Sequence, residues 1–221
     1  MAEKIKKSIP LIIALILGGL IIAMTSFVPQ SVQSDNVAAW ATVGPSVSCS
    51  VEPVAGALSF GTILVSGVSD ADDTATTTFT SNTIGYLKIH DWGDNINSDP
   101  GLWNSTSGPD TIVSPNAGEA ATAVLAGGTE GYGIIAATTT GDGSGSELTI
   151  AQRYNTFYLS GLDPDAVGGL YWGTPTALTI ASSSAAMTNR LVVVSHKAAI
   201  SAATLAGNYK DTIIYTCSTT P

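Results

Sequence analysis

Asparagine and aspartate alternate along one stretch of the sequence, and this is the spacing most suggestive of ligand chemistry. Asn95, Asn97 and Asp99 stand at every second position, and Gly101 follows shortly afterwards. Calcium in proteins is held by several hard oxygen donors, and Asp and Asn at alternate positions of a loop can supply them. The stretch therefore predicts either a calcium site on Asn95, Asn97 and Asp99 or an ordinary Asx-rich turn between strands.

Two tryptophans lie on either side of this stretch. Trp92 precedes it and Trp103 follows it, and both are expected at strand ends or in loops. Aromatic rings can stack on sugars while neighbouring Asp and Asn side chains hold hydroxyl groups, as in a mostly apolar site with a few polar groups. Trp92 and Trp103 thus predict a carbohydrate-binding site, and the alternative is that both rings cap the core of the fold.

The only two cysteines, Cys49 and Cys217, stand far apart in the chain. Cys49 alternates with Val47 and Val51, while Cys217 alternates with Ile213 and Tyr215, so each cysteine points to the apolar side of an expected strand. An even cysteine count in an exported chain is compatible with a disulfide. We expect Cys49 and Cys217 to pair; two separate buried thiols are the alternative.

A catalytic set does not emerge from the remaining residues. Asp91 and Asp94 could form a carboxylate pair for hydrolysis, but no catalytic motif accompanies them. His90 and His196 are the only histidines, no nucleophile elbow accompanies them, and we expect each on the surface or satisfied internally. The acidic group at residues 70–73 is expected to be a solvated turn. The sequence favours a protein that is not an enzyme.

The first 34 residues differ from the rest of the chain. Three lysines precede an uncharged apolar run, which is the pattern of a secretory signal peptide. We expect cleavage after Ser34, with Ala41 as a second candidate. If residues 1–34 are not cleaved, residues 9–28 are long enough to anchor the protein in a membrane. Either way the rest of the chain is predicted to be extracellular or on the cell surface.

Residues 35–46 form a predicted amino-terminal arm. This apolar stretch has no nearby hairpin turn to pair it within its own domain. An extended arm of this kind can add to the sheet edge of another subunit through backbone hydrogen bonds, which predicts self-assembly. The alternative is that the arm folds back on its own domain.

The body of the chain, residues 47–221, has the pattern of an all-β domain. Thr- and Val-rich alternating segments at 74–80, 85–92, 190–196 and 209–217 are separated by turn residues. Weaker strand candidates include residues 58–60 and 155–159. We predict one Ig-like or jelly-roll-type antiparallel β-sandwich with loop insertions, preceded by the hydrophobic signal or anchor helix.

Composition limits the partners of this domain. Of the 221 residues, only 11% are charged, and 8 Lys and Arg against 17 Asp and Glu give a net charge of −9. Nucleic-acid binding is excluded on this basis, because phosphate recognition needs basic surface.

The last strand resembles that of exported bacterial β-sandwich surface proteins of the fimbrial-subunit-like, spore-coat-U-like and WxL-like kinds. It is similar in the spacing of five residues, which are Gly207, Tyr209, Asp211, Ile213 and Tyr215. Near the start, Cys49 followed by Phe60-Gly61 looks like the opening of the same group. The resemblance implies an exported structural or surface protein. Together with the leader, it predicts a cell-surface structural protein that forms filaments or coats, and the alternative is an adhesin or carbohydrate-binding module using Trp92 and Trp103.

Overall fold

The computed structural model describes residues 43–52, 58–91, 100–104, 110–114, 122–139, 143–170 and 177–220. The chain divides into two units, Met1–Val43 and Gly44–Pro221. The predicted leader and residues 35–42 of the predicted arm lie outside the described residues. We call the second unit the body, and its strands and helices are the elements that the structure describes.

Two sheets form the layers of the body, and all their strand pairs are antiparallel. Sheet A runs in the order β1-β3-β13-β8-β11-β7, and β2 and β9 also pair with β13. Sheet B runs β10-β12-β4-β15. The strands of sheet A are β1 (Val47–Glu52), β2 (Val68–Asp70), β3 (Ala75–Ser81), β7 (Thr122–Val124), β8 (Gly131–Thr138), β9 (Ser144–Gly145), β11 (Ala166–Gly168) and β13 (Met187–Ala199). Those of sheet B are β4 (Tyr86–Asp91), β10 (Leu148–Ile150), β12 (Leu178–Ser183) and β15 (Ile213–Ser218).

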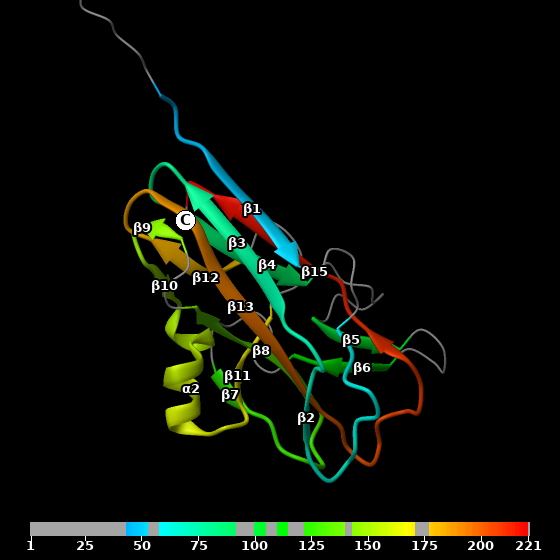
Figure 1. The fold of residues 1–221 in the computed structure, drawn as a ribbon. Helices are drawn as coiled ribbons and strands as arrows, with labels where there is room; N and C mark the ends of the chain where they lie inside the picture. The colour runs from blue at the N-terminus through cyan, green and yellow to red at the C-terminus, as the bar shows by residue number, and fades with distance from the viewer. Residues whose placement is uncertain are drawn as a thin grey trace, which may run out of the picture. The chain divides into compact units, whose positions relative to one another are not determined.

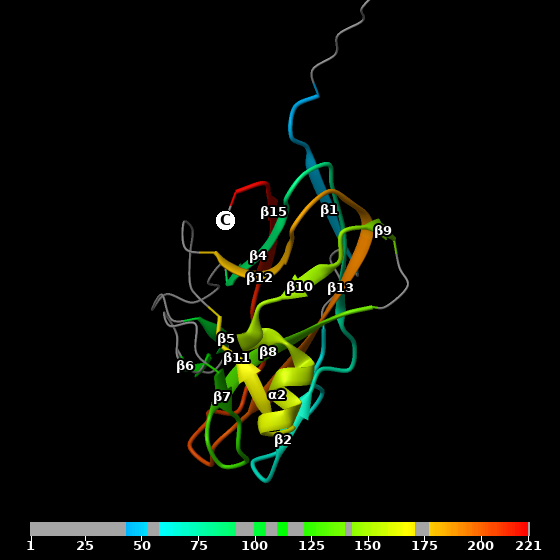
Figure 2. The same cartoon turned by 90° about the vertical axis from the view of Figure 1, so that its left-hand side faces the viewer.

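A third, smaller sheet and two short helical segments complete the body. Sheet C has the order β14-β5-β6, with β5 (Gly101–Asn104), β6 (Asp110–Val113) and β14 (Tyr209–Lys210). The 3-10 helix η1 (Gln152–Tyr154) leads into the α-helix α2 (Thr156–Leu162). Figure 2 shows β1 and β13 on one side of the sandwich and β4, β12 and β15 on the other.

The core lies between the sheets because successive side chains of a strand point to opposite faces, so that every second residue is buried. Along β3, Ala75, Thr77, Phe79 and Ser81 are buried while the residues between them are only partly covered. Phe79 of sheet A, Ile89 of sheet B and Ile112 of sheet C all belong to the same buried cluster and are fully inaccessible. Burial of each side chain of this size stabilises the fold by about 1.5–3 kcal/mol. The prediction of an all-β sandwich is thus confirmed.

Local details differ from the sequence prediction. Residues 155–159 were expected to form a strand, but α2 begins at Thr156 because the Asn155 side chain accepts hydrogen bonds from the backbone N–H groups of Phe157 and Tyr158 and caps the helix. Residues 58–60 are not in a strand. Strands β5 and β7 form in stretches where no strand was expected, since both are short and gain their stability from neighbouring strands rather than from local pattern.

The two ends of the body are made by different elements. In Figure 1 the start of β1 lies at the top, and α2, β7 and β2 lie at the bottom. The chain thus leaves β1 toward its amino terminus at the end of the body opposite to α2 and β7.

Candidate functional site

Strand β1 is the outermost strand of sheet A. Over the residues that the structure describes, β1 has one hydrogen-bonded neighbour, β3, with Val47 opposite Ser81 and Glu52 opposite Thr76. The side chains of Val47, Cys49 and Val51 are partly buried, while the alternate residues of β1 are exposed. The predicted alternation at Cys49 is therefore confirmed, and β1 presents a sheet edge.

The backbone that enters β1 is held mainly by the side chain of Asn82, and the Ser81 hydroxyl adds a bond to the Ser46 carbonyl at 3.2 Å. The Oδ1 atom of Asn82 accepts from the Ser46 N–H at 2.7 Å, and its Nδ2 donates to the Gly44 carbonyl at 2.9 Å. The Asn82 backbone N–H also donates to the Ser46 carbonyl at 3.1 Å. Residues 44–46 are nonetheless exposed, and Val43 is 80% exposed. This last part of the predicted arm is thus fixed in direction without being covered.

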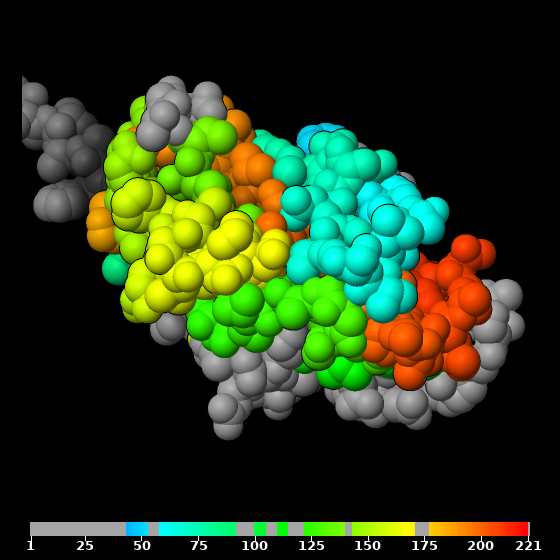
Figure 3. Space-filling model, turned by 90° about the horizontal axis from the view of Figure 1, so that it is seen from below, coloured from blue at the N-terminus to red at the C-terminus, as the bar shows by residue number. Residues whose placement is uncertain are grey.

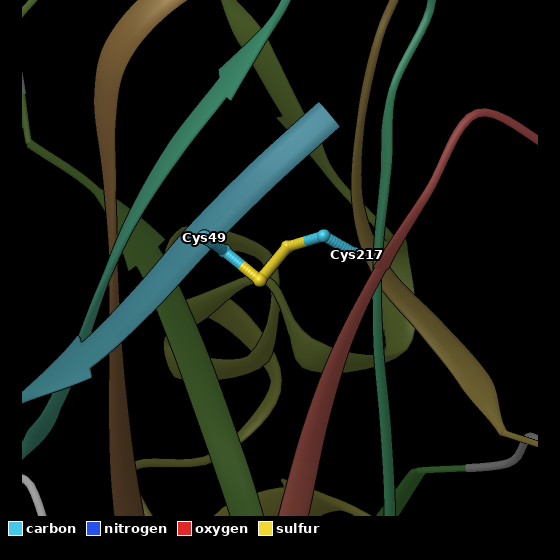
Figure 4. Close-up of a disulfide and its surroundings, with 2 residues drawn as sticks. All are labelled: Cys49 and Cys217. Carbon is cyan, nitrogen blue, oxygen red and sulfur yellow. A yellow bond between two sulfur atoms is a disulfide. The ribbon is translucent and has the colours of Figure 1, made fainter. Parts of the chain in front are cut away.

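A disulfide ties β1 to the opposite sheet. Cys49 of β1 and Cys217 of β15 are bonded, with their Cα atoms 6.1 Å apart (Figure 4). Cys217 lies opposite Leu87 in the pairing of β15 with β4, so it faces the interior from sheet B. The predicted Cys49–Cys217 pair is confirmed. Since both strands are the end strands of their sheets, the bond closes this side of the sandwich.

A buried polar group lies further along the same sheets. Tyr132 of β8 is 2% exposed and His196 of β13 is 4% exposed, and the rings stack at 5.9 Å between centroids. Burial raises the pKa of the Tyr132 phenol well above its usual value, and the negative charges of Asp211 and Asp91 raise it further. Burial also raises the pKa of Tyr215. Both phenols therefore stay protonated and act as hydrogen-bonding parts of the interior rather than as acids.

Asp91 stabilises the backbone instead of being presented to a substrate. It is fully buried, and its Oδ2 accepts from the Gly101 N–H at 2.7 Å. Gly101 has φ +143°, and a Cβ there would lie 2.2 Å from the Ile112 carbonyl, so only glycine fits. The other member of the considered carboxylate pair, Asp94, lies outside the described residues. Asp91 has a clear structural role in joining β4 to β5.

The two histidines are both buried rather than on the surface. His90 is 2% exposed, and burial lowers its pKa while the charge of Asp91 offsets part of that effect. Burial lowers the pKa of His196 to about 4. Both are therefore neutral at pH 7.

The acidic residues at 70–73 are individually partnered. Asp70 forms an ion pair with Lys197 at 3.0 Å, Asp72 accepts from the Ser59 N–H, and Asp73 accepts from the Thr74 N–H. The side chain of Asp70 is 68% exposed and that of Lys197 only 11%, so Asp70 supplies a negative charge to a mostly buried ammonium group. Asp70 thus ends β2, and the exposed residues Asp72 and Asp73 follow it outside any strand.

The predicted ligand sites are described only in part. Asn95, Asn97, Asp99 and Trp92 lie outside the described residues, so calcium binding and the pairing of the two tryptophans stay predictions. Trp103 is half-buried on β5, where Thr111 and Lys210 lie opposite it on the flanking strands. Its indole N–H is buried. Among the described residues no group of three or more His, Cys, Asp or Glu is arranged to hold a metal ion.

Asn82 was not singled out from the sequence. It stands in Ser81-Asn82-Thr83, directly after a Thr-rich strand, and an Asn in a turn often bonds to nearby backbone. That signal predicts a turn, but it does not reveal that the bonded backbone is 36 residues earlier in the chain.

No protein-family model matches this chain, and no curated protein matches it. Among the helices of the described residues, none is both long and apolar enough to cross a membrane.

Proposed function

We propose that this protein is an exported, non-catalytic structural subunit of the cell surface, which assembles into filaments or a coat through its amino-terminal arm. The observation that carries the proposal is the path of residues 44–46, which are exposed yet held by Asn82 beside the edge strand β1. An exposed segment whose direction is already fixed can bind another chain at a lower entropy cost, because less of it has to be ordered on binding.

The sequence before β1 supports the same proposal. Residues 36–51 contain no charged side chain, although the protein carries 17 Asp and Glu. An uncharged extended segment can enter a sheet edge without desolvating a charge.

The disulfide supports the exported location. Disulfides persist in oxidising compartments outside the cytoplasm. A bond between the end strands of the two sheets also suits a structural subunit, because it keeps β1 attached to the body when the preceding segment is pulled.

Electron microscopy of the exported protein tests the proposal. Filaments or sheets are expected from the wild type. A variant in which residues 37–43 are replaced by Gly and Ser, which keeps the chain length, is expected to remain monomeric with an unchanged circular-dichroism spectrum. Monomeric wild-type protein, or assembly that persists in the Gly/Ser variant, would contradict the proposal.

A second candidate function is carbohydrate binding at Trp103. The cross-strand register gathers an indole, a hydroxyl and an ammonium group on one face of sheet C, from Trp103, Thr111 and Lys210. Such a set suits a sugar ligand. Glycan-array binding that is lost in Trp103→Ala and in Trp92→Ala would favour this function, whereas binding by neither wild type nor variants would reject it.

A further inference from the structure

Two polar atoms of sheet C are buried and have no hydrogen-bond partner in the part of the chain that the structure describes. They are the indole Nε1 of Trp103 and the hydroxyl Oγ1 of Thr111. Native proteins keep few such groups, because a buried donor or acceptor without a partner lowers stability. Trp103 and Thr111 stand directly opposite each other in the pairing of β5 with β6. Two unpartnered groups on neighbouring strands indicate that a molecule from outside the chain completes their hydrogen bonds.

Both side chains lie on the face of sheet C that is turned away from the hydrophobic cluster. On the other face, Leu102 of β5 and Ile112 of β6 are opposite each other and belong to that cluster. Because successive side chains of a strand alternate between the two faces, Trp103 and Thr111 share the opposite one. The Cβ atoms of a directly opposite pair lie about 4.5–5.5 Å apart, so one small ligand can contact both side chains.

Exposed residues border the pair on both flanks. Val113 lies on the same face of β6 as Thr111 and is 40% exposed. Lys210 of β14 stands opposite Trp103 on the other flank and is also exposed. Figure 3 shows the chain that leads from β13 to β14, in orange to red, on the surface of the body. The pair therefore lies between solvent-exposed positions of sheet C and not deep inside the body.

On the basis of the carbohydrate-binding function given above as the second candidate, we infer that Trp103 Nε1 and Thr111 Oγ1 are the two groups that hydrogen-bond a saccharide. An indole N–H only donates, so it needs an acceptor oxygen, whereas a hydroxyl both donates and accepts. Neighbouring hydroxyl groups of a sugar ring supply both kinds of partner. The apolar face of the same ring suits contact with the indole, as in a mostly apolar site with a few polar groups.

This assignment predicts opposite effects of one substitution on stability and on binding. Thr111→Val removes the hydroxyl and keeps the branched shape of the side chain. Without a saccharide the hydroxyl is an unpaired buried group, so the melting temperature of Thr111→Val is expected to equal or exceed that of the wild type. With a saccharide the hydroxyl is paired, so the same substitution is expected to weaken binding about tenfold. A residue that serves only the fold would lose stability instead.

Nuclear magnetic resonance of the full exported chain tests the inference. Cellotriose, chitotriose and trigalacturonic acid are the probes, and the resonance of the Trp103 indole N–H is the readout. That resonance is identified by its loss in Trp103→Phe, which removes the N–H but keeps an aromatic ring. At least one trisaccharide is expected to shift it, and the affinity for that trisaccharide is expected to fall about tenfold in Trp103→Phe and in Thr111→Val.

Thr77→Val is the matched control. The Oγ1 of Thr77 is likewise buried and without a partner among the described residues, but it lies in sheet A. Thr77→Val is expected to keep or raise the melting temperature, as Thr111→Val does, and to bind the trisaccharide like the wild type.

The outcomes separate the inference from the function on which it rests. If a trisaccharide binds Thr111→Val and Trp103→Phe as tightly as the wild type, these two groups hold only water, and the inference is wrong while carbohydrate binding stands. A clear fall in the melting temperature of Thr111→Val would also overturn the inference, because the hydroxyl would then serve the fold. If none of the three probes shifts the Trp103 resonance, both the inference and the carbohydrate-binding function are wrong.

Discussion

His196 Nδ1 lies 2.8 Å from the Tyr132 hydroxyl, in a hydrogen bond between two neighbouring strands of sheet A that is shielded from solvent. This bond pairs the two side chains in the interior. A buried polar pair is stable only while its hydrogen bonds are complete. The protonation of His196 therefore links the stability of the sandwich to pH.

Acid is expected to destabilise the protein through His196. Its folded-state pKa is about 4, below the unfolded value near 6.5, so the unfolded state binds a proton in the range where the folded state does not. The stability that comes from keeping His196 neutral is fully present above about pH 6.5. As the pH falls to about 4, the free energy of unfolding decreases by about 3 kcal/mol for this reason. Urea denaturation of wild type and His196→Gln at pH 7 and pH 4 measures it.

The two proteins should differ in their pH dependence. Gln does not titrate, so the difference in free energy of unfolding between wild type and His196→Gln is expected to shrink by about 3 kcal/mol from pH 7 to pH 4. Equal differences at both pH values would mean that His196 is protonated without cost in the folded state.

The Cys49–Cys217 bond is expected to provide much of the stability. It closes a loop with a sequence separation of 168, for which the chain-entropy relation gives about 5 kcal/mol. Cys49→Ser combined with Cys217→Ser should lower the free energy of unfolding by about that amount in guanidinium titrations. Reductant should destabilise the wild type to a similar level and leave the double variant unchanged. A wild type insensitive to complete reduction would contradict this expectation.

Helix α2 depends on its first capping residue. Asn155→Ala removes the acceptor of the Phe157 and Tyr158 N–H groups and is expected to cost about 1 kcal/mol. Asn155→Asp keeps an acceptor oxygen and should lose much less. Thermal denaturation of both variants beside the wild type measures the difference, and equal losses would show that the amide nitrogen rather than the cap matters.

The sequence predicted those parts of the fold whose signal is local. Alternation at Cys49 and Cys217 correctly placed both sulfurs on the inner faces of their strands, and an even cysteine count favoured their bond. The helix at Thr156–Leu162 was missed because Phe157 and Tyr158 have strand propensity, while the deciding contact is the Asn155 side chain. Propensity is a weak signal in a segment this short.

The candidate site was less predictable because it is made by contacts between distant segments. Asn82 and Ser46 are brought together only by the pairing of β1 with β3. The segment after α2 is likewise joined to a distant part of the chain, since the Leu125 N–H after β7 donates to the Asp165 carbonyl. Exposure of Phe157 depends on the direction of α2, and no periodicity in seven residues specifies that direction.

The side-chain hydrogen bonds of Asn82 allow assembly to be separated from stability. Asn82→Ala removes the two side-chain bonds to Ser46 and Gly44, but it leaves the bonds that the Asn82 backbone N–H and the Ser81 hydroxyl donate to the Ser46 carbonyl. Because the lost bonds are exposed, the free energy of unfolding is expected to change by less than about 1 kcal/mol. The released arm must then be ordered on binding, at about 1–2 kcal/mol for each residue freed, so assembly should weaken about tenfold.

Asn82→Asp is the matched control. The carboxylate keeps the acceptor for the Ser46 N–H but has no donor for the Gly44 carbonyl, so its assembly is expected to lie between that of the wild type and that of Asn82→Ala. Light scattering across a concentration series gives the critical concentration, and chemical denaturation gives the stability of the same samples. If Asn82→Ala lost stability in proportion to assembly, Asn82 would serve the fold of the body; if it assembled like the wild type, the direction of the arm would play no part in the contact between copies.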